Sequence, residues 1–192
     1  MGILLAFAPF VVFAILNGLA GPAGALAAAA AVSAALIARD LLRARRRVKI
    51  LEAGTFALFA GLALFTVLAG THWSVIGVRL CVDAGLLVIV LASMVARRPF
   101  TLQYAREQVP PELWNRPEFI RTNYVITGVW ALAFAMLVLT ETALLYVPSL
   151  PQRAGVVAII LTLIGAVKFT SWYPERQARL VPAGPPAGDV AA

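Results

Sequence analysis

The sequence predicts an all-α integral membrane protein with about six transmembrane helices arranged as three hairpins. Three observations predict this class. The 192-residue chain is 61% hydrophobic and only 13% charged, with a mean hydropathy of +0.89, whereas soluble domains are about 45–50% apolar and about 25% charged. The apolar residues form runs close to the length of about 20 residues that a bilayer-crossing helix needs. Lys and Arg gather between alternate runs, a pattern typical of cytoplasmic loops.

The apolar runs define the helices in chain order, at about 3–20, 23–38, 50–69, 74–96, 124–147 and 153–173. These runs do not alternate as β-barrel strands do, and helices satisfy their own backbone groups inside lipid. The transmembrane domain is thus predicted to cover residues 1–173. The tail 174–192, rich in Pro, Gly and Ala, is expected to be disordered.

The first two helices are the least typical. Residues 23–38 are mostly alanine, which favours a helix packed inside the bundle, because small residues let backbones approach closely. An alternative interpretation makes residues 1–20 a cleaved signal peptide, although no Lys or Arg precedes the apolar run as a signal peptide normally requires.

Orientation follows from the basic residues of the connecting segments. The 39–49 segment carries six of them, the 97–123 segment carries five, and the tail adds Arg176 and Arg179. With six helices, all three segments face one side, so both termini are expected in the cytoplasm. Nucleic-acid binding is not expected, because the basic run is short, lies next to the membrane and contains no recognisable binding module.

Two segments are candidate contacts for anionic lipid headgroups or partner proteins. The first is the basic cluster Arg45, Arg46 and Arg47, which is either a topology signal or a lipid contact. The second is the amphipathic connection 97–123 with Trp114 and Phe119, which is either an interfacial connector or a docking surface.

Helix five is predicted to begin within this connection, before the chain enters the membrane. Asn115 precedes Arg116-Pro117 and is followed three residues later by Glu118. This spacing is typical of a capping box.

Five ionisable residues fall within the predicted helices. Arg79 and Asp83 lie one turn apart on helix four, and Glu141 on helix five reaches a similar depth, so these three can meet in the outer leaflet. Glu52 and Lys168 lie near the inner ends of helices three and six and can pair. Such charges either hold helices together as ion pairs or form a proton or substrate pathway.

No enzymatic or cofactor chemistry is predicted. The sequence contains no G-x-S-x-G, H-E-x-x-H, P-loop or G-x-G-x-x-G motif. The single cysteine, Cys81, excludes a disulfide within the chain and a cysteine-cluster metal site. The single histidine, His72, cannot build a zinc site alone.

Several segments, in order over about residues 5–173, resemble the intracellular septation protein A family. They are the proline-containing run 7–13, the basic turn 45–49 followed by Thr55-Phe56 and Gly61-Leu62, the step 97–100, the run 109–114, and Asn123 followed by Trp130-Ala131. The resemblance implies a non-enzymatic protein of the bacterial inner membrane, linked to cell division, septation and cell-envelope integrity.

In that role the protein would act through contacts with lipids or with division and envelope-synthesis proteins. The alternative function is a small membrane transporter or channel that uses the intramembrane charges. The oligomeric state stays open.

Overall fold

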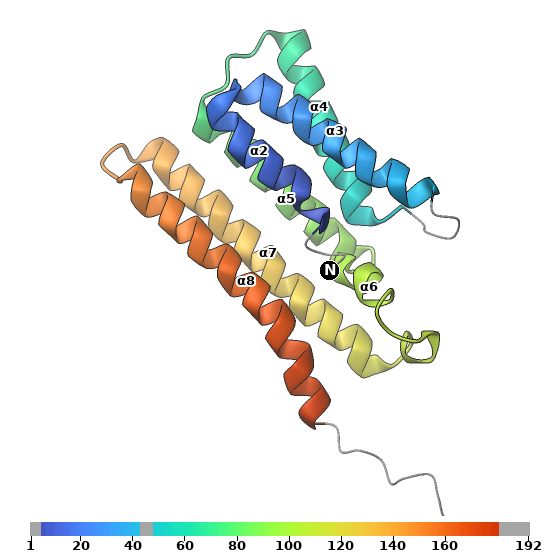
Figure 1. Cartoon of the computed structure of the whole chain (residues 1–192). Helices are drawn as coiled ribbons and strands as arrows, with labels where there is room; N and C mark the ends of the chain where they lie inside the picture. Colours follow the sequence, from blue (N-terminus) through green and yellow to red (C-terminus); the bar gives the residue numbers. More distant parts are fainter. Residues whose placement is uncertain (1–4, 43–47, 181–192) are drawn as a thin grey trace, which may run out of the picture.

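The computed structural model describes residues 5–42 and 48–180, with side chains described up to residue 177. Over these residues the chain forms seven α-helices and one short 3-10 helix, with no strand (Figure 1). They are α2 (Ala8–Leu19), α3 (Gly21–Leu42), α4 (Ile50–Ala69), α5 (Val75–Val95), α6 (Phe100–Ala105), η1 (Pro111–Leu113), α7 (Pro117–Tyr146) and α8 (Gln152–Leu180). The predicted all-α class is confirmed for this part of the chain.

Five of these helices, α3, α4, α5, α7 and α8, are long and apolar enough to cross a membrane. Their outward faces keep large apolar side chains exposed, such as Val67, Val88 and Leu161, as a lipid-facing surface requires. The protein is therefore a multi-pass membrane protein.

The first predicted span, 3–20, differs from what the structure describes. Helix α2 has 12 residues, so it rises only about 18 Å, against a hydrocarbon core of about 30 Å. Pro9 lies in its first turn, where a missing backbone N–H costs least. The described helix ends at Leu19, before Gly21 adopts a left-handed φ of 74°, and residues 1–4 lie outside the described part.

Helix α4 begins and ends where predicted, because Gly70, with φ of 57°, provides a left-handed cap. Helix α3 extends beyond the predicted 23–38 to Leu42, so Arg39 is helical rather than part of a loop. Helix α5, at Val75–Val95, is one residue shorter than predicted at each end.

Helix α7 begins at Pro117, seven residues before the predicted membrane span and as the proposed interfacial start implies. The predicted capping box at Asn115 is wrong: the N-cap is Arg116, and no side chain caps the helix. Proline at the first helical position has a suitable φ and no N–H to satisfy.

Helix α8 continues to Leu180, past the predicted end at residue 173, so the predicted disordered tail is wrong for residues 174–180. A proline inside a helix removes one backbone hydrogen bond. Pro174 is followed by Glu175, Arg176 and Gln177, which are good helix formers. Residues 181–192 lie outside the described part.

Consecutive helices pack against one another along the chain, α2 on α3, α3 on α4 and α4 on α5, followed by α5 on α7 and α7 on α8. The turns 70–74 and 147–151 lie at one end of the bundle (Figure 1). The other end holds α6, η1, the start of α2 and the end of α8. We call the end with the 96–116 connection and Lys49 the basic end, and the other the opposite end.

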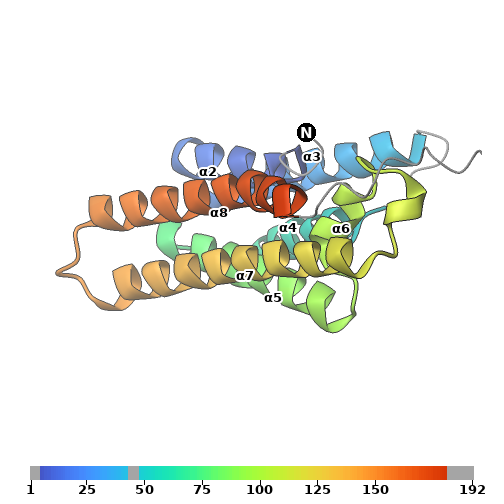
Figure 2. The ribbon, with the colours of Figure 1, turned by 90° about the horizontal axis from the view of Figure 1, so that it is seen from below.

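Helix α2 packs one face into the core, with Pro9, Phe13 and Asn17 buried. It and α8 are on the same side of α5 and α7 (Figure 2). The Phe7 ring, just before α2, stacks on Trp130 of α7 at 4.7 Å between centroids. Phe10 and Phe13 contact the fully buried Phe59 of α4 at 5.0 and 5.6 Å. The N-terminal segment therefore joins α4 to α7 through aromatic contacts, although α2 is too short to span.

Candidate functional site

The charged residues of α5 and α7 meet near the opposite end of the bundle. Arg79 Nε lies 2.9 Å from Glu141 Oε1. The Glu141 carboxyl is 1% exposed, and neither of its oxygens has a well-aligned hydrogen bond among the described residues. The contact is therefore an ion pair by distance. The Asp83 carboxyl is a close electrostatic neighbour of both groups.

The depth of this cluster follows from helix geometry. Arg79 lies four residues into α5, and Glu141 lies five residues before α7 ends at Tyr146. At 1.5 Å of rise per residue, both side chains start about 6–8 Å inside their helices. The Arg79 side chain is 28% exposed whereas Glu141 is buried, so the carboxylate depends on the arginine for compensation.

A groove of about 330 Å³ adjoins this cluster. Its two sides come from the α2 segment and α8, and its floor comes from α5 and α7, which agrees with the layering in Figure 2. Arg79 and Asp83 are its charged lining residues, and five aromatic rings line it: Phe7, Phe10, Phe13, Trp130 and Phe134. Val11 lines the groove and is 56% exposed, so the groove opens to the surroundings of the bundle.

A second charged cluster lies at the basic end, where Lys49 immediately precedes α4. Lys49 Nζ lies 2.9 Å from Asp40 Oδ2 and 3.3 Å from both Glu52 Oε1 and Glu107 Oε1. It also lies 4.7 Å from the centroid of the Tyr104 ring. Lys49, Asp40 and Glu52 are each at most 5% exposed. One cation thus connects the end of α3, the start of α4 and the α6 region.

The electrostatics of this basic-end cluster follow from the contacts. Burial lowers the pKa of Lys49, but the hydrogen bond that Lys49 Nζ donates to Asp40 and the charges of Glu52 and Glu107 outweigh this effect, so that pKa is raised above its ordinary value. Burial first, and then Glu52, raise the pKa of the Tyr104 hydroxyl, which donates a hydrogen bond of 3.4 Å to Glu52 Oε1. Lys49 is therefore a buried cation that three carboxylates compensate.

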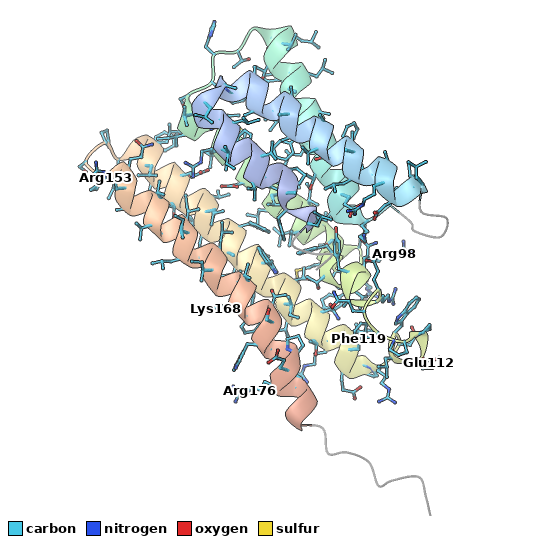
Figure 3. The ribbon with its side chains drawn as sticks, viewed as in Figure 1. Arg98, Glu112, Phe119, Arg153, Lys168 and Arg176 are labelled. Carbon is cyan, nitrogen blue, oxygen red and sulfur yellow. The ribbon has the colours of Figure 1, made fainter. Side chains whose placement is uncertain are left out.

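The predicted pair of Glu52 with Lys168 is wrong. Glu52 pairs with Lys49, three residues earlier on the same helix start. Lys168 is exposed on α8 and lies in a row with Trp172 and Arg176, and Figure 3 shows Lys168 and Arg176 along that helix. The prediction used depth alone, and depth does not determine which helices are neighbours.

The two aromatic contact candidates have different environments. The Trp114 indole donates a hydrogen bond to Val109 O at 3.1 Å, and the Arg106 guanidinium lies 5.5 Å from its ring centroid. Trp114 therefore holds its own segment together. Phe119 is half-buried and lines an open cavity of about 630 Å³ between the connection, α7 and the end of α8. Arg45, Arg46 and Arg47 lie outside the described residues.

Sequence reasoning missed Asp40, which is fully buried and bonded to both Arg39 and Lys49. Its signal was visible: it is the one acidic residue within the basic 39–49 run. The aromatic groove had no comparable signal, because its rings come from segments more than a hundred residues apart.

Comparison with known proteins finds no family model, curated protein or solved structure that matches this chain. The resemblance to the intracellular septation protein A family thus stays a prediction that rests on the motifs quoted above.

Proposed function

We propose that this protein binds an amphiphilic small molecule within the membrane and acts as a small transporter. The observation that carries the proposal is the groove between the α2 segment and α8, where apolar aromatic walls end at Arg79 and Asp83. Small-molecule sites are typically apolar pockets of about 300–1,000 Å³ with a few placed polar groups, and this groove has about 330 Å³. Charges inside a membrane are costly and commonly mark pathways.

A groove of this kind suits a molecule with two unlike parts. Its apolar part would lie against rings such as Phe10 and Phe134, and its polar part would lie at the charged end. Burial of apolar surface would supply most of the binding free energy. The charged end would orient the molecule.

The first test is saturable binding to the protein in lipid nanodiscs, with empty nanodiscs as background. The probes are radiolabelled tetraphenylphosphonium and tetraphenylborate, which share a shape and differ in charge. We expect at least one of them to bind saturably. Ala14→Phe, which fills the groove from α2, should abolish that binding because Ala14 lines the groove.

The matched control is Ala57→Phe, which adds the same ring at an exposed position of α4 outside the groove. It should leave binding unchanged. If neither probe binds saturably, or if Ala14→Phe binds as well as Ala57→Phe, the groove is not a binding site and the proposal is wrong.

A role in cell division and the envelope, as the family resemblance implies, is the second candidate. The observation that favours it is the cavity at the basic end, where Phe119 and Leu113 line a space of about 630 Å³ together with the end of α8. An open cavity with apolar side chains offers a place for a partner protein segment.

A deletion strain tests this second candidate. If the protein acts in division or in the envelope, its loss should produce filamentation or envelope defects. The parent gene should rescue these defects, and a gene that carries Phe119→Ala should not. Phe119 is a cleaner target than Trp114, whose removal would break the Arg106 and Val109 contacts. Phe56→Ala, an exposed phenylalanine on α4, is the control and should rescue. Normal cells without the gene would contradict this role.

A further inference from the structure

The charged end of the groove has an excess of carboxyl groups. Among the residues that the structure describes, Arg79 is the only basic one that lines the groove. Its Nε is already within 2.9 Å of Glu141 Oε1. Asp83 also lines the groove and lies beside this pair. Arg79 can offset one of these two carboxyl groups, so Asp83 is left to compensate a positive charge that enters the groove.

The aromatic rings of the groove favour the same sign of ligand. The faces of aromatic rings carry negative electrostatic potential and attract cations, most strongly when water is excluded. The rings of Phe7 and Trp130 stack with 4.7 Å between their centroids. The centroid of the Phe134 ring lies 5.5 Å from that of Trp130 and 6.2 Å from that of Phe7. All three line the groove, so the apolar groups of the ligand would lie against rings that tolerate a positive charge nearby.

An anionic head group would meet the opposite situation. The positive charge available to an anionic group would be that of Arg79, which is already paired with Glu141. The adjacent Asp83 carboxyl would repel the anionic group. Removing Arg79 from Glu141 would also leave a carboxylate that is 1% exposed without compensation.

We infer that the ligand of this groove is a hydrophobic organic cation, whose positive centre lies at Asp83 and whose apolar groups lie against the rings of the α2 segment and α7. This inference rests on the proposed function and specifies its ligand class. Asp83 is the carboxylate that compensates the ligand, and Arg79 prevents Glu141 from adding a second uncompensated charge.

The pair of probes tests the sign of the charge directly. In nanodiscs, after subtraction of binding to empty discs, tetraphenylphosphonium should bind about tenfold more tightly than tetraphenylborate, since the phosphonium gains both the Asp83 charge and the ring faces. Asp83→Asn should remove this preference, and Asp83→Glu should restore part of it. Lys168→Gln, an exposed charge on α8, should leave it unchanged.

The outcomes separate the inference from the function it rests on. No saturable binding of either probe would overturn both the groove site and the inference. Equal or tighter binding of the borate would overturn the cation class and leave the groove site standing. An unchanged preference in Asp83→Asn, with the variant shown to be folded by its thermal unfolding, would overturn the role of Asp83.

Discussion

Replacing Arg79 by methionine is expected to destabilise the protein by about 3–5 kcal/mol, the cost of removing one partner from a buried ion pair. The reason is the environment of Glu141, which is 1% exposed and has Asp83 beside it. Without the guanidinium, a buried carboxyl group has no compensating charge. The measurement is the free energy of unfolding, obtained from denaturation by SDS in mixed micelles.

The two partners should not be equivalent. Glu141→Leu should cost less than Arg79→Met, because Arg79 is 28% exposed and keeps Asp83 as a neighbour. The double variant Arg79→Met with Glu141→Leu should recover much of the lost stability, since apolar replacement of a buried pair is often neutral. A coupling energy near zero in this double-mutant cycle would show that the pair does not hold α5 and α7 together.

Replacing Lys49 by methionine is expected to have an effect of similar size, a loss of about 3–5 kcal/mol in the free energy of unfolding. The lysine is 5% exposed and lies within 3.3 Å of carboxylate oxygens from Asp40, Glu52 and Glu107. Its loss leaves these carboxylates close together, and like charges repel. Unfolding by SDS again provides the measurement.

Two further variants make the Lys49 prediction specific. Lys168→Met removes a lysine at an exposed position of α8 and should change stability by less than about 0.5 kcal/mol. Adding Asp40→Asn to Lys49→Met should recover part of the loss, because the 2.9 Å contact joins these two side chains. A Lys49→Met protein as stable as Lys168→Met would show that the basic-end cluster contributes nothing to the fold.

Some predictions that depend on one segment agreed with the structure, and others did not. The bounds of α4 were predictable because an apolar run ends at a glycine that caps the helix. The start of α7 near Pro117 was predicted from a capping box at Asn115 that the structure does not contain, and the preference of proline for the first turn accounts for it instead. The end of α8 was not predictable in the same way, since Pro174 stops many helices but is tolerated in this one.

Predictions that depend on two segments were uneven. Arg79 and Glu141 lie together, and helix depth alone had allowed this contact. The same depth argument paired Glu52 with Lys168, whereas Glu52 contacts Lys49. The depth of a residue in the membrane does not identify its ion-pair partner, because residues from several helices lie at the same depth. The partner depends on which helices are neighbours in the fold.

The amino-acid sequence is enough to predict that this chain is helical, that it crosses a membrane several times and that a few charges lie within its helices. These properties follow from composition and from the length of the apolar runs, and each run can be recognised from its own residues without knowing which helices lie beside it. Only the packing of the helices shows that Lys49 is buried, that α2 packs against the core and that aromatic rings from α2 and α7 line one groove with Asp83. Those features need helices from distant parts of the chain to be adjacent, and that adjacency comes from side-chain packing that no single segment specifies.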